Sequence, residues 1–331
     1  MPTLTLQQRK DKIDWLIDKE IYDNDELVYA FVSGLYHNRE IEEYIGYVNT
    51  LLSVVNEKYR IYYRLWYISL LYLHGDFDMA KKEFFSLSLT NVPGHIKEFY
   101  LKKLGFDELY KTWIIRETES FIFHIHPGRY EKKEEICHRI SRRQLGYEIV
   151  GKNFFGITLE RKIHYFLWDA KEMKGYFSAS QTCSCYGVIQ EGEYDRDWHE
   201  SAHVYNYLFG IENSKSFILE GIAVVNDGRK ASVRLRSAQT AYRELGIRVT
   251  IEKWWKDSTA FRNTNSWITY TTAGYFVLKL WKKYGKEKLL RLAKYQTYED
   301  GCRIYGESEL LKAIRETEEE IMSLQSVSCC N

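Results

Sequence analysis

The stretch WHESAHVYNYLFGIENSKSFILEGIA, residues 198–223, decides the fold of this chain. Within it His199, Glu200 and His203 have the spacing HExxH, which places two imidazoles four residues apart on one face of a helix. Both imidazoles can then bind one metal ion while the glutamate lies beside it. The sequence therefore predicts a metal-binding helix that Asp195 or Asp197 caps at its start and that ends at Gly210.

A third ligand is expected from the helix that follows. Glu220 interrupts an otherwise apolar stretch over 217–225, and a buried carboxylate needs a partner such as a metal ion. The chain between His203 and Glu220 is long enough to turn and form an antiparallel helix. Gly221 and Ala223 are small enough to let these two helices approach closely, so Glu220 is predicted to complete the site.

HESAH followed by LEGIA resembles the gluzincin branch of the zincin metallopeptidases, in which a Glu on the next helix is the third zinc ligand. The stretch at 270–285 is similar to the helix that follows this ligand in that superfamily, and IYGESELLKAIRE at 304–316 resembles its C-terminal helices. The resemblance extends over about 118–322. It implies a zincin-like catalytic domain.

The resemblance also implies a zinc-dependent metallopeptidase with one zinc ion per chain, held by His199, His203 and Glu220. Glu200 would be the general base for a zinc-activated water that attacks a peptide bond. The expected substrate is a peptide or protein, and the expected activity is that of an endopeptidase of restricted specificity. The stretch 186–192 is expected to form an edge strand on which an extended peptide pairs.

Away from the ligands, the sequence departs from the pattern of this family. No histidine follows His203, so the oxyanion donor is expected to be Tyr270 or Tyr275, with Tyr270 preferred. The GxMEN motif that holds a free amino terminus in related aminopeptidases is absent from the sequence. Position 224 is Val where an acid is common, which leaves Asp227 as the nearest support for the ligands.

Hydrophobic periodicity divides the chain into two predicted domains. Residues 1–117 read as successive amphipathic helices, and residues 118–331 as the zincin-like domain with a small mixed sheet. The fold class is therefore predicted to be α+β, with an all-α domain first. Expected helices include 6–20, 25–36, 41–55, 58–73, 77–87, 94–104, 106–115 and 131–148; expected strands are 119–128, 162–168 and 186–190.

Composition excludes several classes of function. In 331 residues Lys and Arg total 47 and Asp and Glu total 46, so the net charge of +1 provides no general attraction to nucleic acid or an anionic membrane. No apolar run approaches the roughly 18 residues of a membrane span. With no secretory signal and only 6 cysteines, a cytoplasmic protein with reduced thiols is expected.

Two other interpretations stay open at this stage. One is a catalytically inactive, zinc-stabilised protein-binding module, with a protein partner for the N-terminal helices; the other is an RNA-associated helical protein. His124 and His126 could also form a second metal pair, although ordinary strand residues fit the pattern better. Cys183 and Cys185 are interpreted as structural thiols.

Overall fold

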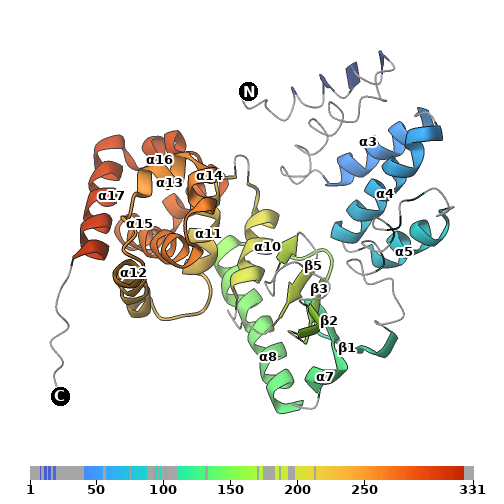
Figure 1. The fold of residues 1–331 in the computed structure, drawn as a ribbon, viewed down its shortest axis with the longest axis horizontal. Helices are drawn as coiled ribbons and strands as arrows, with labels where there is room; N and C mark the ends of the chain where they lie inside the picture. Colours follow the sequence, from blue (N-terminus) through green and yellow to red (C-terminus); the bar gives the residue numbers. More distant parts are fainter. Residues whose placement is uncertain are drawn as a thin grey trace. The chain divides into compact units, whose positions relative to one another are not determined.

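The computed structural model shows a chain made mainly of helices with one small mixed sheet, as the α+β prediction requires (Figure 1). The structure describes residues 41–54, 57–74, 76–87, 111–130, 133–169, 171–173, 183–185, 188–192, 198–211 and 214–323, with isolated positions before residue 102. The helices expected over 25–36 and most of 94–104 lie outside the described residues. Among the helices in the described ranges, none has both the length and the apolar character that a membrane crossing demands.

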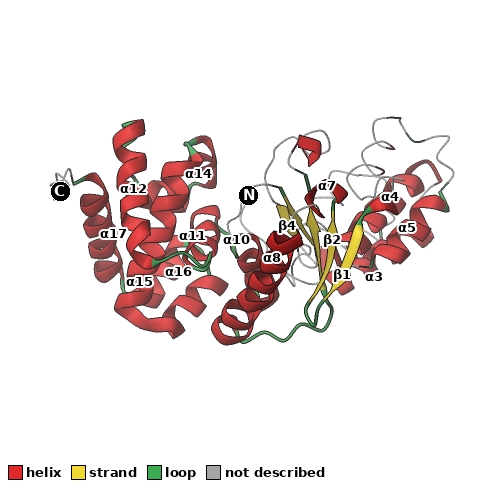
Figure 2. Ribbon diagram, turned by 90° about the horizontal axis from the view of Figure 1, so that it is seen from below, coloured by secondary structure: helices red, strands yellow, loops and turns green. Residues whose placement is uncertain are grey.

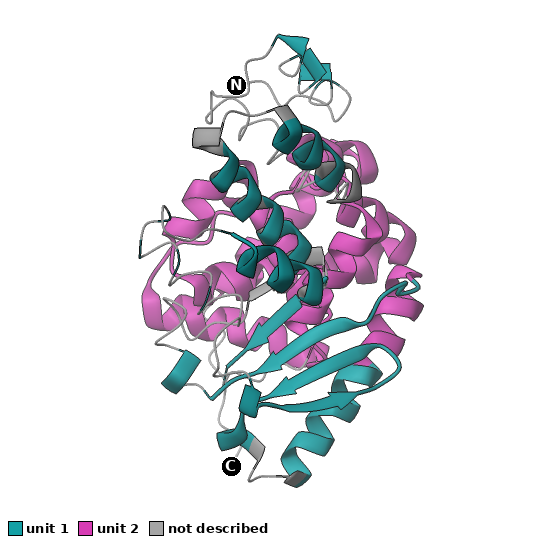
Figure 3. Ribbon diagram, turned by 90° about the vertical axis from the view of Figure 1, so that its right-hand side faces the viewer, with its two compact units in different colours: residues 1–145, 158–195 teal, residues 146–157, 196–331 magenta. Residues whose placement is uncertain are grey.

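The chain forms two compact units, which Figure 3 shows in different colours. Residues 1–145 and 158–195 make the first unit, and residues 146–157 and 196–331 make the second. This division differs from the predicted boundary between residues 117 and 118. The sheet belongs with the N-terminal helices and not with the helix of the HExxH motif.

The first unit contains both layers of a helix-and-sheet fold. Its helices are α3 (Ile41–Val54), α4 (Glu57–His74), α5 (Phe77–Phe85), α7 (Pro127–Tyr130) and α8 (Lys133–Gly146). Its strands are β1 (Ile114–Glu117), β2 (Phe121–Ile125), β3 (Ile163–Leu167), β4 (Cys183–Cys185) and β5 (Val188–Glu191). The last residue of α8, Gly146, belongs to the second unit.

The five strands lie in the order β1-β2-β3-β5-β4. Strands β2, β3 and β5 are parallel to one another, and β1 and β4 pair antiparallel at the two edges. The prediction that 186–192 forms an edge strand is therefore wrong, because β4 pairs with β5 on its outer side. The strand β1 also replaces the end of the helix expected over 106–115, since Ile114 and Ile115 pair with β2.

Helices cover both faces of this sheet, with α8 on one side and α3 to α5 on the other (Figure 2). On the second side, Leu65, Ile68 and Phe84 share a buried core with Phe166 and Trp168. The N-terminal helices thus bury their apolar face against the sheet, which is why they do not form a separate unit.

The second unit is built from helices in the described part of the chain. Its elements are a π-helix η3 (Tyr147–Phe155) that continues from α8, α10 (His199–Phe209), α11 (Ser216–Val225), α12 (Ala231–Leu245), α13 (Ile251–Lys256), α14 (Ser258–Asn263), α15 (Ser266–Lys294), α16 (Tyr298–Tyr305) and α17 (Glu307–Met322). The backbone of α15 breaks at Gly285, whose φ of 83° lies in the left-handed region that favours glycine.

Candidate metal centre

Helix α10 brings the two histidines of the HExxH motif together. The Nε2 atoms of His199 and His203 are 3.2 Å apart, and their rings are nearly perpendicular at 89°. The helix begins at His199, directly after Trp198. The Trp198 ring lies against two glycines: a Cβ atom at Gly146 would come within 2.6 Å of the ring, and one at Gly228 within 3.2 Å. The expected capping residues Asp195 and Asp197 lie outside the described residues.

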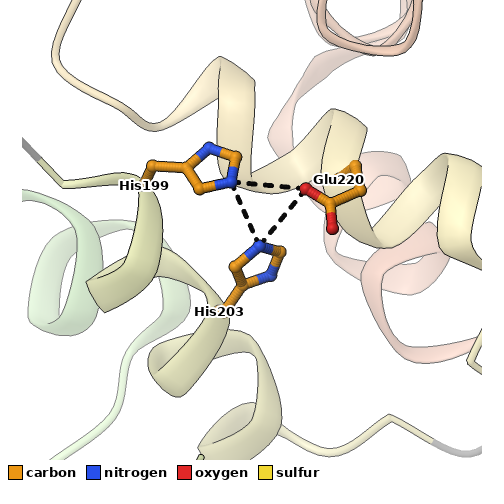
Figure 4. A group of neighbouring side chains, drawn as sticks. All are labelled: His199, His203 and Glu220. Atoms are coloured by element: carbon orange, nitrogen blue, oxygen red, sulfur yellow. Dashed lines mark hydrogen bonds and ion pairs between the residues drawn. The ribbon is translucent and has the colours of Figure 1, made fainter. Parts of the chain in front are cut away.

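Helix α11 adds the predicted third ligand to this pair (Figure 4). The Glu220 Oε2 atom lies 3.3 Å from His199 Nε2 and 3.4 Å from His203 Nε2. Donor atoms on a tetrahedral zinc ion with bonds of about 2.0–2.1 Å are roughly 3.3 Å apart. The three side chains therefore converge with the spacing that one such ion requires.

The convergence leaves polar atoms of these side chains without ordinary partners. His199 and His203 are buried, and among the described residues their Nδ1 atoms have no hydrogen-bond partner. Although Glu220 Oε2 is close to both rings, it makes no hydrogen bond of good geometry there and is buried. A cation between the three groups would satisfy Oε2 and both Nε2 atoms at once, so the donor set fits a metal ion.

Electrostatics within the cluster favours a bound positive charge. Burial alone lowers the pKa of His203, but the carboxylates of Glu220 and Glu200 outweigh this effect and raise the pKa. Burial likewise acts to raise the pKa of Glu220, yet the two histidines hold it well below its ordinary value. Without a metal the carboxylates favour a proton on His203, and a divalent cation would take the place of that proton.

The two tyrosines considered as oxyanion donors lie in different surroundings. The ring of Tyr270 is stacked on the ring of His199, with the two ring centroids 6.4 Å apart. The ring of Phe261 is also stacked on Tyr270, at 5.7 Å between centroids. Tyr275 instead donates a hydrogen bond to Glu320. Burial, and to a smaller extent this hydrogen bond, raises the pKa of Tyr275. Tyr270 is therefore the tyrosine of the two that the structure places beside the cluster.

Gly221 permits a close approach of helices, but its partner differs from the expected one. A Cβ atom at Gly221 would lie 2.9 Å from the Ala273 carbonyl oxygen and 2.6 Å from Val277, both on α15. The expectation that Gly221 serves the contact with α10 is therefore wrong. Val224 packs in turn over Gly274, where a Cβ would come within 2.2 Å of it, so position 224 is used for packing between α11 and α15.

The sequence predicts that Asp227 supports the metal ligands, but its carboxylate binds two arginines instead. Its buried carboxylate accepts hydrogen bonds from Arg229 at 2.7 Å and from Arg234 at 2.8 Å. These two arginines outweigh the effect of burial and lower its pKa. The carboxylate stabilises the turn after α11.

Sequence reasoning missed the π-helix that packs behind α10. In η3, Tyr147 contacts Tyr205 with ring centroids 5.7 Å apart, and Phe155 contacts Phe209 at 5.5 Å. Its residues carry no sequence signal that separates a π-helix from a continuation of α8. The aromatic contacts hold the side of α10 that faces away from Glu220.

His124 and His126 do not form a metal pair. His124 Nε2 lies 2.9 Å from His164 Nδ1 on the neighbouring strand, whereas His126 contacts Glu172 at 2.9 Å. Burial, and to a smaller extent the neighbouring His164, lowers the pKa of His124 to about 3. Burial also lowers the pKa of His164 to about 4, although the Asp78 carboxylate acts in the opposite direction. Both rings of this strand pair are therefore neutral at physiological pH.

The neutral pair predicts an acid-sensitive first unit. Because both folded pKa values lie below the unfolded value of 6.5, the unfolded chain binds more protons, so stability is complete above pH 6.5 and falls towards pH 4. Replacing His124 with Phe, which can stack on Phe166 as the imidazole does, should reduce the loss between pH 7 and 4.5 by on the order of 1–2 kcal/mol. Urea unfolding at the two pH values measures it. The exposed His138→Asn variant is the control, and an unchanged acid loss in His124→Phe would contradict the assignment.

In the part of the chain that the structure describes, one group of three or more His, Cys, Asp or Glu side chains has ligand atoms close enough to share a metal ion. This group is His199, His203 and Glu220. Comparison of the chain with protein-family models, with curated proteins and with solved structures found no match.

Proposed function

We propose that this chain is a zinc-dependent metallopeptidase of the gluzincin type, an endopeptidase of restricted specificity. The observation that carries the proposal is the convergence of His199, His203 and Glu220 at mutual distances of 3.2–3.4 Å. The HExxH spacing and the downstream Glu, which resemble that family, support the same conclusion.

The residues around the cluster have distinct tasks in this proposal. A bound zinc ion would lower the pKa of a water molecule and polarise a peptide carbonyl. Glu200, half-buried beside His199, accepts the proton of the attacking water at its carboxylate and returns it to the departing amine. Tyr270 donates its phenolic hydrogen to the oxygen that becomes negative during attack.

Metal content tests the proposal most directly. The purified protein should hold about one zinc ion per chain, and His203→Ala should lose it, because two remaining ligands bind zinc far more weakly than three. Elemental analysis after dialysis against dilute zinc provides the measurement, with the exposed His138→Ala as the control. Zinc in neither protein, or equal zinc in the wild type and His203→Ala, would contradict the site.

The two tyrosines of α15 provide a matched pair for the oxyanion donor. Tyr270→Phe should lower kcat for hydrolysis of a random-sequence peptide pool by about 10²-fold, because it removes one hydrogen-bond donor from the developing charge. Tyr275→Phe removes the same atom from a hydroxyl that contacts Glu320 and should change kcat little. Mass spectrometry of the products gives both rates, and equal effects would exclude Tyr270 as the donor.

Zinc without turnover on any peptide pool would instead favour the binding-module alternative. In that outcome, removal of the metal should lower both stability and the affinity for a protein partner. A Glu200→Gln variant separates the two outcomes further, because it should lose hydrolysis only if the protein is an enzyme.

A further inference from the structure

A small surface hollow, with about 10 Å³ of space, opens in the second unit where α11, α12 and α15 meet. Helices α11 and α12 both pack against α15 (Figure 1). Val224 lies on the wall of the hollow, one turn or about 6 Å along α11 from Glu220. Thr271, which also lines the hollow, directly follows Tyr270 in the sequence. The full lining is Val224, Arg229, Val233, Arg234, Ser237 and Thr271.

Arg234 in this lining has an incomplete set of partners. Its side chain is only 4% exposed. Nη2 donates to the carbonyl oxygen of Val225 at 3.2 Å and to Asp227 at 2.8 Å, whereas the buried Nη1 has no hydrogen-bond partner among the described residues. A buried charged donor without an acceptor is costly, so an acceptor in the hollow would stabilise it.

The local charge determines what kind of acceptor fits. Arg229 and Arg234 both line the hollow, and Asp227, which contacts both, can neutralise only one of them. The other lining residues are neutral, with the hydroxyls of Ser237 and Thr271 beside two valines. The site therefore has one excess positive charge and a planar guanidinium donor, which matches a carboxylate.

We infer that this hollow binds a carboxylate group of the peptide substrate. The inference rests on the proposed function for the position of the peptide relative to the metal centre. Because Val224 lies one turn of α11 from Glu220, a carboxylate in the hollow is expected to belong to a residue near the bond that is cleaved. The carboxylate is either the C-terminus of the peptide or the side chain of Asp or Glu.

Binding to the metal-free protein tests the inference independently of turnover. The probes are acetyl-tetra-alanine with a free C-terminus, the same peptide as an amide, and an amide with one internal Asp. Chemical-shift titration at 0.15 M salt should show at least one acidic peptide binding about 10-fold more tightly than the neutral amide. The free acid or the internal Asp, whichever binds more tightly, identifies the source. Equal affinities for all three peptides would overturn the inference.

Two variants of Thr271, whose side chain lies at the exposed rim, separate charge from size. Thr271→Glu places a carboxylate at the hollow and should abolish the preference for acidic peptides, because it supplies the missing acceptor from within the chain. Thr271→Gln has the same size without the charge and should keep the preference. An equal preference in the two variants would also overturn the inference. Because these measurements need no metal, failure of the zinc or turnover experiments leaves their result intact.

Discussion

Replacing Glu200 with Gln is expected to lower peptide hydrolysis by about 10²–10⁴-fold while leaving the zinc content unchanged. Glutamine keeps the size of the side chain and can still donate and accept hydrogen bonds, but it cannot accept a proton from water at neutral pH. The carboxylate of Glu200 lies close enough to raise the pKa of His203, yet it is not one of the three converging ligands. The variant therefore removes the proposed base and keeps the three proposed metal ligands.

Turnover of a random-sequence peptide pool and zinc content should be measured on the same preparation of Glu200→Gln. The matched control is Glu244→Gln, which makes the same change at an exposed position of α12. Unchanged hydrolysis by Glu200→Gln would show that Glu200 is not the general base. Simultaneous loss of zinc would show that it supports the metal instead.

The second large effect is expected in the first unit, where Arg143→Met should lower the free energy of unfolding by about 3–5 kcal/mol. Arg143 is 1% exposed and its Nη2 lies 2.9 Å from both carboxylate oxygens of Glu191, while its Nε donates to Tyr165 at 2.8 Å. Removing the guanidinium leaves the buried Glu191 with Arg139, whose Nη1 lies 3.2 Å away, and with the Tyr165 hydroxyl, and methionine fills the volume without restoring the lost charge.

Arg142→Met, one residue earlier on α8 and less buried, is the control for loss of an arginine from this helix. The double change of Arg143→Met with Glu191→Gln should recover part of the loss, because the buried carboxylate that has lost its closest cation is also removed. Amide hydrogen exchange of β2 and β3 reports on this unit alone. Similar protection in Arg143→Met and Arg142→Met would contradict the importance of the buried pair.

Local rules predicted the parts of the candidate site that depend on a single helix. A separation of four residues places His199 and His203 on one helix face whatever surrounds them, because the helical period is fixed. Glu220 was found for an equally local reason, since a carboxylate within an apolar helix needs a partner.

Choices between equivalent local patterns required the tertiary structure. Tyr270 and Tyr275 have the same chemistry, but five residues of helix rotate them to different sides of α15, and their neighbours decide which one lies by His199. Gly221 predicted a close helix contact without naming the partner, and packing selected α15 in place of α10.

By itself, then, the sequence determined the HExxH helix, the convergence of Glu220 with its two histidines and the α+β class, because each follows from the period of a helix or the cost of burying a charge. Only the tertiary structure decided that β4 covers β5, that the N-terminal helices share a core with the sheet, and that Arg234 lines a hollow beside Arg229. These features depend on contacts between residues far apart in the chain. A strand such as Val188–Glu191 has the same local pattern at the edge of a sheet as inside it, so its neighbours decide its place.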